Sequence, residues 1–163
     1  MGTIIAFWVL AATAVLSGLA VVGLRSIFRS ALALILCFLS VAGLFITLSA
    51  DFLAAVQVLI YVGAVAVIII LAIMLTREVE HGNLANRMRI PALGVSVFFL
   101  AVATFAAIGT SWPVSQLAPQ EDTTAFLGRL LFGTQGFVLL VEIAALIILA
   151  TIIGAISIAR ENK

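Results

Sequence analysis

The sequence predicts an all-α integral membrane protein with five transmembrane helices. Three features predict this fold class: 65% of the 163 residues are apolar, only 9% are charged, and the mean hydropathy is +1.38. Soluble domains are about half apolar and about a quarter charged. The charged residues also cluster, which leaves apolar runs of about twenty residues, long enough to cross ~30 Å of hydrocarbon as α-helices. The runs lack the alternation that is typical of β-barrel strands.

Charged residues or a proline mark most ends of the five predicted spans, which we expect to form a single membrane domain over 1–163. The first apolar run stops at Arg25 and Arg29, and the second stops at Asp51. The third stops at Arg77, and the fourth begins with Pro91 in its first turn, where the missing N–H costs nothing. The fifth is the last long apolar run. The predicted helices are 4–24, 30–50, 52–75, 90–110 and 137–158.

Positive charges gather on one side of the predicted bundle. Of the eight Lys and Arg residues, all but Arg129 fall in the first and third connections or at the C-terminus. Because basic residues are enriched on the cytoplasmic side, we expect the N-terminus outside and the C-terminus in the cytoplasm, in a bacterial cell (inner) membrane. The compact form favours a bacterial source over an organelle. The residues on the expected cytoplasmic side are Arg25, Arg29, Arg77, Arg87, Arg89, Arg160 and Lys163.

The first apolar run is expected to be a retained helix. No basic residue precedes it and no convincing small-residue cleavage site follows it, as a signal peptide would require. Trp8 and Trp112 both fall toward the expected outer interface, where indole rings favour the headgroup region.

No set of residues in the sequence completes an active site or holds a cofactor. Cys37, the one cysteine, lies in the middle of a span and is interpreted as a structural thiol. His81, the one histidine, falls in the expected cytoplasmic loop. No Gly-rich phosphate loop follows a strand. We therefore expect no metal, no cofactor and no nucleic acid on this chain, and a part in catalysis only as one subunit of an enzyme.

Glu142 is the one carboxylate placed clearly inside a predicted span. A carboxylate facing lipid costs ~3 kcal/mol or more, so such residues usually face a partner or a water path. One interpretation is therefore a residue of a proton or coupling path. The alternative is that the span starts later than predicted, so that Glu142 caps the helix at the interface.

Polar residues also interrupt the third span, at Gln57 and Tyr61, and Gly63 follows them. The simplest role for Gln57 is a hydrogen bond to another helix. The Tyr61 hydroxyl either makes a structural bond to a neighbouring helix or takes part in a water path or a helix rearrangement. Gly63 permits close helix contact or a distorted backbone.

Pairs of small residues at four-residue spacing predict close helix–helix packing. The pairs are Ala14 with Gly18 in the first span and Ala150 with Gly154 in the fifth. Such pairs let two helix backbones approach each other, and they are common in membrane proteins.

The run Gln57-Val58-Leu59-Ile60-Tyr61-Val62-Gly63-Ala64-Val65 closely resembles the third transmembrane helix of the chain 6 (subunit J) family of respiratory complex I, the proton-pumping NADH–quinone oxidoreductase. Two further segments are similar to the same family: 127–132, before its last helix, and 142–156, with its Glu-x-Ala and Gly-Ala-Ile pattern. Leu140-Val141 departs from the Pro-Phe that the family often has before the glutamate.

The resemblance implies a membrane-arm subunit that binds no cofactor and helps to couple quinone reduction to proton pumping. FMN, iron–sulfur clusters and quinone are then expected in partner subunits. The implied partners are the quinone-site subunit, the small three-helix subunit and the antiporter-like subunits. In that family the third helix can adopt a π-bulge, and Tyr61 to Gly63 match that region, which implies a flexible third helix with Gln57, Tyr61, Gly63 and Glu142 as candidate coupling residues.

Two other function classes compete with this interpretation. One is a membrane subunit of a cation/proton antiporter or of a membrane-bound hydrogenase assembly, which has related helices. The other is a free-standing small transporter, which is disfavoured because the five spans show no inverted repeat and no pair of interrupted helices.

Overall fold

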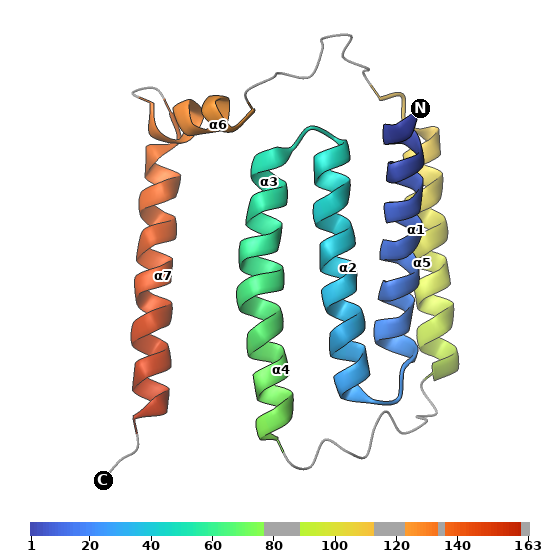
Figure 1. Cartoon of the computed structure of the whole chain (residues 1–163), viewed down its shortest axis with the longest axis horizontal. Helices are drawn as coiled ribbons and strands as arrows, with labels where there is room; N and C mark the ends of the chain where they lie inside the picture. The colour runs from blue at the N-terminus through green and yellow to red at the C-terminus, as the bar shows by residue number, and fades with distance from the viewer. Residues whose placement is uncertain (77–88, 113–122, 134–135, 161–163) are drawn as a thin grey trace. The chain divides into compact units, whose positions relative to one another are not determined.

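The computed structural model describes residues 1–76, 89–112, 123–133 and 136–160. They belong to two compact units, Met1–Pro119 and Gln120–Lys163. Five of their helices are long and apolar enough to cross a membrane, which confirms the predicted all-α class with five spans (Figure 1). The single domain over 1–163 stays a prediction. The five helices are Gly2–Gly23, Ile27–Thr47, Asp51–Leu75, Ile90–Gly109 and Val138–Ala159.

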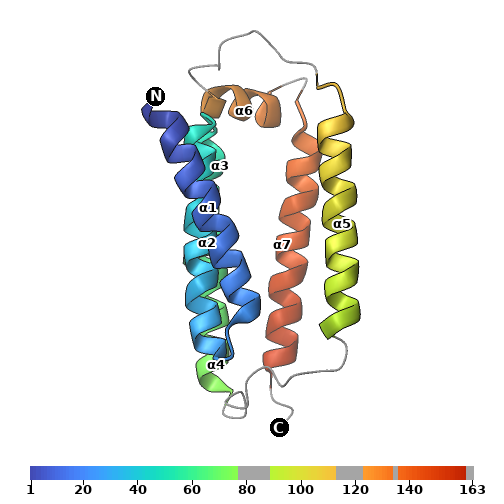
Figure 2. The same cartoon turned by 90° about the vertical axis from the view of Figure 1, so that its right-hand side faces the viewer.

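Helix α2 (Ile27–Thr47) is the centre of the packed part of the first unit. On one side it contacts α1 (Gly2–Gly23), which is inclined across it in Figure 2. On the other side it contacts a third rod that is built from three consecutive segments. These segments are α3 (Asp51–Val56), the π-helix η1 (Gln57–Val65) and α4 (Ala66–Leu75).

Small side chains form the buried seams of this three-rod arrangement. The buried apolar residues are all alanines, and no large side chain is fully buried among the described residues. Small residues let helix backbones approach closely, which replaces the hydrophobic driving force that is missing within a bilayer. The buried residues are Ser17, Ala31, Ser40, Ala42, Ala54, Gln57 and Ala66.

Helices α1 and α2 meet through a thiol hydrogen bond and through two glycines. The Cys37 thiol donates a hydrogen bond to the Ala14 carbonyl, with 3.6 Å between sulfur and oxygen. One turn further along α1, a Cβ on Gly18 would lie 3.9 Å from the same sulfur. Nearer the N-terminus of α1, Leu10 covers Gly43 of α2. The contact between Cys37 and α1 is compatible with the interpretation of Cys37 as a structural thiol.

Both ends of α2 lie three residues earlier than the predicted 30–50. At its C-terminus, Ser49 has the left-handed φ of 57°, and Ala50 donates its N–H to the Phe45 carbonyl at 2.9 Å. Ser49 donates to the Ile46 carbonyl at 3.0 Å, so the pair forms a Schellman motif. The charged residues mark the edge of the apolar run, whereas backbone hydrogen bonding decides where the helix ends.

Helix α5 (Arg89–Gly109) is the fourth span, and every residue from 90 to 109 is exposed. Just after it, the Trp112 indole N–H donates to the Ala107 carbonyl at 3.0 Å, which folds the ring back toward the helix end. An apolar helix that is exposed on all sides in the described chain is typical of a membrane span.

The second unit contains a short helix, α6 (Thr123–Phe132), and the last span, α7 (Val138–Ala159). Helix α6 contacts α7 and lies crosswise at its N-terminal end in both views (Figures 1 and 2). Two glycines shape the corner: Gly133 donates to the Arg129 carbonyl, and Gly136 donates to the Gly133 carbonyl, both at 2.8 Å. Phe137 then donates to the Leu130 carbonyl at 2.8 Å, which ties the start of α7 to α6.

Candidate functional site

The third membrane helix contains nine consecutive residues with π-helical hydrogen bonding, Gln57–Val65. Before this segment the bonding is ordinary, since the Gln57 N–H points to the Leu53 and Ala54 carbonyls. After it, the Ala66 N–H donates to the Tyr61 carbonyl, five residues back. π-Helical turns are rare and are frequent at functional sites. The segment coincides with the run that distinguished the sequence.

The π-helix places Gln57 and Ala66 on the same face of the rod. Gln57 is 8% exposed and Ala66 is 2% exposed, and α2 is the described helix that contacts both segments. In a regular α-helix the nine-residue separation is about two and a half turns, which would put the two residues on opposite faces. The wider π turns complete about two full turns over the same nine residues. The burial of both residues therefore depends on the π register.

Tyr61 lies in the middle of the π-helix and packs against α2. Its ring meets the Phe38 ring edge to face, with centroids 5.4 Å apart and planes inclined by 68°. Edge-to-face pairs at this separation are favourable because the positive ring edge meets the negative ring face. Tyr61 is 45% exposed, and its hydroxyl makes no hydrogen bond to any residue in the described ranges.

Gln57 and Gly63 have different surroundings from each other. Gln57 is 8% exposed as a whole residue, and its side chain forms no hydrogen bond with the rest of the described chain, so the expected bond to another helix stays a prediction. Gly63 is exposed, and a Cβ there would meet only the Val58 carbonyl, at 3.4 Å, among the described residues. Val58 lies five residues before Gly63, the spacing of a π-helical hydrogen bond.

Glu142 lies in α7, four residues after its first residue and thus ~6 Å along the axis. Its side chain is exposed. The N-cap of α7 is Phe137, which makes no side-chain cap bond, and the first turn contains no acidic residue. Within the described chain, Glu142 therefore caps no backbone N–H, although an interfacial position stays compatible with its depth.

A family model for NADH-ubiquinone/plastoquinone oxidoreductase chain 6 matches residues 17–158, a range that includes η1 and almost all of α7. The chain belongs to this family. The resemblance noted in the sequence is thereby confirmed, and the interpretation as an antiporter or hydrogenase subunit is set aside. This chain 6 protein is a membrane-arm subunit of a quinone oxidoreductase, an oxidoreductase complex.

Its relatives are similar to nearly the whole of this chain and over most of their own length. Subunit J of the F(420)H(2) dehydrogenase of Methanosarcina mazei is 37% identical over 94% of this chain and 89% of its own length. Subunit 6 of the NAD(P)H-quinone oxidoreductase from the organellar chromatophore of Paulinella chromatophora is 40% identical over 98% of this chain and 78% of its own. Chain 6 of the same enzyme from Leptolyngbya boryana is 38% identical over 98% and 80%.

The two pairs of small residues in the chain 6 protein lie in different surroundings. Ala14 and Gly18 lie against Cys37 of α2. Ala150 and Gly154 of α7 are exposed, and a Cβ on Gly154 would meet nothing within 4 Å in the described ranges. Close packing on the α7 pair therefore stays a prediction.

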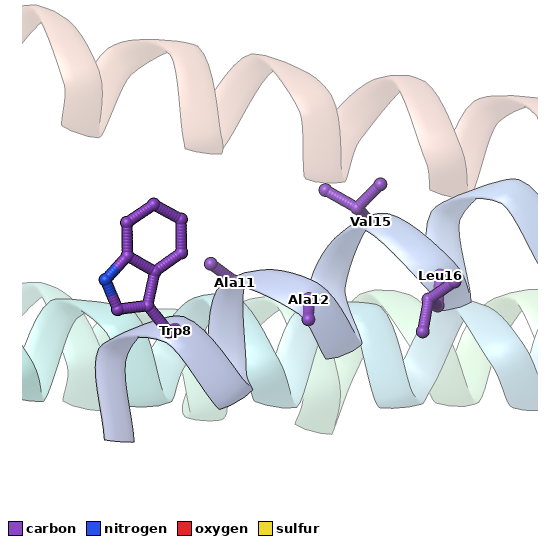
Figure 3. Close-up of a pocket in the computed structure, with 5 residues that line it drawn as sticks. All are labelled: Trp8, Ala11, Ala12, Val15 and Leu16. Atoms are coloured by element: carbon purple, nitrogen blue, oxygen red, sulfur yellow. The ribbon is translucent and has the colours of Figure 1, made fainter. Parts of the chain in front are cut away.

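An apolar hollow along α1 adds no chemistry to the site. Its lining comes from one stretch of the helix, and Figure 3 shows Trp8, Ala11 and Val15 pointing to the same side. Apart from the indole N–H, these side chains offer only hydrocarbon contact. The lining residues are Trp8, Ala11, Ala12, Val15 and Leu16.

Other candidate ligands in the chain 6 protein are scattered or outside the described residues. His81 falls within 77–88, which is not among them. Across the described ranges, no three His, Cys, Asp or Glu side chains gather at one point.

Sequence reasoning missed Phe38. It is one of eleven phenylalanines, and no motif or spacing distinguishes it in the sequence. A helical wheel of the second span would show only that Phe38 belongs to an apolar helix. Its contact with Tyr61 becomes visible once α2 and η1 are packed together.

Proposed function

We propose that this chain 6 protein couples quinone reduction to proton translocation in the membrane arm of an NADH–quinone oxidoreductase, through a change of register in its third helix. The observation that supports this proposal is the π-helix Gln57–Val65 in the middle of a membrane span. A segment with two alternative hydrogen-bonding patterns is the kind of two-state element that coupling requires.

The change of register would move polar and apolar residues between faces. If η1 became a regular α-helix while α3 kept its place, α4 would rotate by about half a turn relative to α3. Ala66, now buried, would turn away from α2, and Ala64, now exposed, would turn toward it. Gly63 supports this change because glycine has no side chain to resist a rearranging backbone. Such a rotation can open or close a water path along the helix.

Glu142 is proposed as a proton-path residue of the same subunit. It is an exposed carboxylate on an apolar span, where contact with lipid alone would cost ~3 kcal/mol or more. A neighbouring subunit or a chain of water molecules next to α7 would remove that cost. Gln57, buried without a hydrogen bond to the described residues, is proposed to bind water or a partner side chain in one of the two registers.

The redox chemistry is proposed to take place on partner subunits, with FMN, iron–sulfur clusters and quinone bound there. The relatives' names support this division, since one belongs to an F(420)H(2) dehydrogenase and others to NAD(P)H-quinone oxidoreductases. A membrane subunit that is similar across different electron donors does not need a donor site of its own. The proposed neighbours in the membrane are the quinone-site subunit, the small three-helix subunit and the antiporter-like subunits, within a bacterial cell membrane.

Affinity purification of the tagged chain from membranes in mild detergent tests the assembly, with partners identified by mass spectrometry. We expect flavin, iron–sulfur, quinone-site and antiporter-like subunits, and the soluble subunits will identify the electron donor. Recovery without any quinone-site subunit would contradict the proposal. Proton translocation per electron in proteoliposomes then tests the coupling role, with the third-helix variants described below.

A further inference from the structure

We infer that Phe38 is a positioning residue for Tyr61, and that the contact between their rings favours the π register of Gln57–Val65. This inference rests on the proposed function, because it names the residue that sets the balance between the two registers. Phe38 lies on α2, outside the segment that would rearrange.

Helix α2 is a suitable support because it is held on its far side. Cys37, the residue before Phe38, donates its thiol hydrogen bond to Ala14 of α1. Three residues after Cys37, Ser40 is buried and bonds to its own helix at the Leu36 carbonyl, 2.8 Å away. The ring of Phe38 therefore extends from a packed helix, and Tyr61 is the partner that can move.

Tyr61 connects the ring contact to the register of the π-helix. It is the fifth of the nine residues. Its carbonyl accepts a hydrogen bond from the Ala66 N–H, and Ala66 is the first residue after the π-helix. Two turns over nine residues correspond to about 80° per residue, compared with about 100° in an α-helix. Tyr61, four residues after Gln57, would therefore swing by about 80° around the axis if η1 became α-helical.

The rotation would displace the Tyr61 ring by more than its present distance from the Phe38 ring. At the outer radius of a helix with its side chains, an 80° rotation moves a group by about 7 Å. The rings of Phe38 and Tyr61 are 5.4 Å apart and favourable aromatic pairs extend only to about 7 Å, so the contact exists in one register and is lost in the other. Because the Tyr61 hydroxyl has no partner in the described chain, the ring itself carries the preference.

Electron cryomicroscopy of the complete complex tests the inference, through the proportion of particles with residues 57–65 in the π or the α register during turnover. We expect Phe38→Leu to lower the ratio of π to α particles by about two- to tenfold, the range that an aromatic pair supplies. Phe38→Tyr keeps a ring and should retain the wild-type ratio. Tyr61→Phe should retain it as well, since it removes only the hydroxyl.

Phe45→Leu is the matched control, because Phe45 lies on the same helix and is similarly half-buried but forms no aromatic pair among the described residues. An equal shift in Phe45→Leu, or no shift in Phe38→Leu, overturns the inference. If Phe38→Leu does not assemble, Tyr61→Leu removes the same contact from the other side and must produce the same shift. In thermal denaturation, the pair Phe38→Leu and Tyr61→Leu must also be non-additive, whereas additive losses of Tm overturn the inference.

The outcome also separates this inference from the proposed function. A shifted register with unchanged proton translocation per electron supports the role of Phe38 and contradicts the coupling role of the third helix. An unchanged register in Phe38→Leu, together with loss of pumping in Gly63→Val, contradicts the role of Phe38 and leaves the proposed function standing.

Discussion

Leu10 of α1 lies directly over Gly43 of α2. A Cβ built on Gly43 would be 2.8 Å from one Leu10 methyl carbon and 2.9 Å from the other. The spacing of small residues in the sequence singles out Gly18 of α1, which lies against Cys37, but it does not single out Gly43 of α2.

Gly43→Val is expected to lower the stability of the folded chain by ~1–3 kcal/mol, because the added methyl groups overlap the Leu10 side chain. Thermal denaturation of the purified protein in detergent measures the loss. Leu10→Ala in the same chain should restore part of it by making room. Gly18→Ala is the control, since its Cβ would lie an ordinary 3.9 Å from Cys37 Sγ. A loss in the control equal to that in Gly43→Val would contradict the steric explanation.

Gly136→Ala is expected to open the corner between α6 and α7. A Cβ on Gly136 would overlap the Leu130 carbonyl and come within 2.9 Å of the Gly133 carbonyl, and backbone atoms cannot turn aside as a side chain can. Hydrogen exchange at Phe137, whose N–H bonds to Leu130, should accelerate. Gly128→Ala in α6 meets nothing within 4 Å and should leave this exchange unchanged; acceleration there would mean that any change in α6 loosens the corner.

Gly63→Val is expected to lower proton pumping and quinone reduction while the complex still assembles. The β-branched side chain stiffens the backbone at the π-helix, yet Gly63 is exposed and packs against no described helix. Gly63→Ala, whose Cβ would lie 3.4 Å from the Val58 carbonyl, should have a milder effect. Both activities are measured in proteoliposomes. Turnover and pumping at the wild-type level in Gly63→Val would refute a switching third helix.

Glu142→Gln is expected to reduce turnover by about tenfold or more, because the amide cannot carry a proton along the proposed path. The substitution keeps the size and polarity of the side chain, so assembly should be unaffected on native gels. Glu142→Asp, which keeps the carboxylate, should retain part of the activity. Full activity with intact coupling in Glu142→Gln would favour a purely interfacial role for this residue.

The orientation is predicted from the distribution of positive charge, with the N-terminus outside and the C-terminus in the cytoplasm. Single cysteines placed at Arg160 and at Thr3, in a chain in which Cys37 is replaced by Ala, should react with a membrane-impermeant maleimide from opposite sides. In intact cells, only the cysteine at position 3 should be labelled. Labelling of position 160 alone would reverse the orientation and move Glu142 to the cytoplasmic half of the membrane.

The membrane class and the five spans could be predicted from the sequence because each depends on composition along a short stretch of chain. Four of the five predicted spans agree with the structure to within two residues at each end. The second span differs by three because Arg29 lies inside α2 and because Ser49, not a charge, ends it. A hydropathy pattern locates the hydrocarbon, whereas a helix ends where its hydrogen bonds end.

By itself the sequence determined that Gln57, Tyr61 and Gly63 form an unusual group in the third span, and the resemblance of their motif to chain 6 identified the family. Only the tertiary structure decided that Gln57 and Ala66 share a buried face, that Phe38 is the partner of Tyr61, and that Gly43 of α2 lies under Leu10 of α1. The physical reason is that every apolar side chain satisfies a membrane span equally well. Which of them touch depends on how neighbouring helices rotate and pack, and that information is not local to any one segment of the chain.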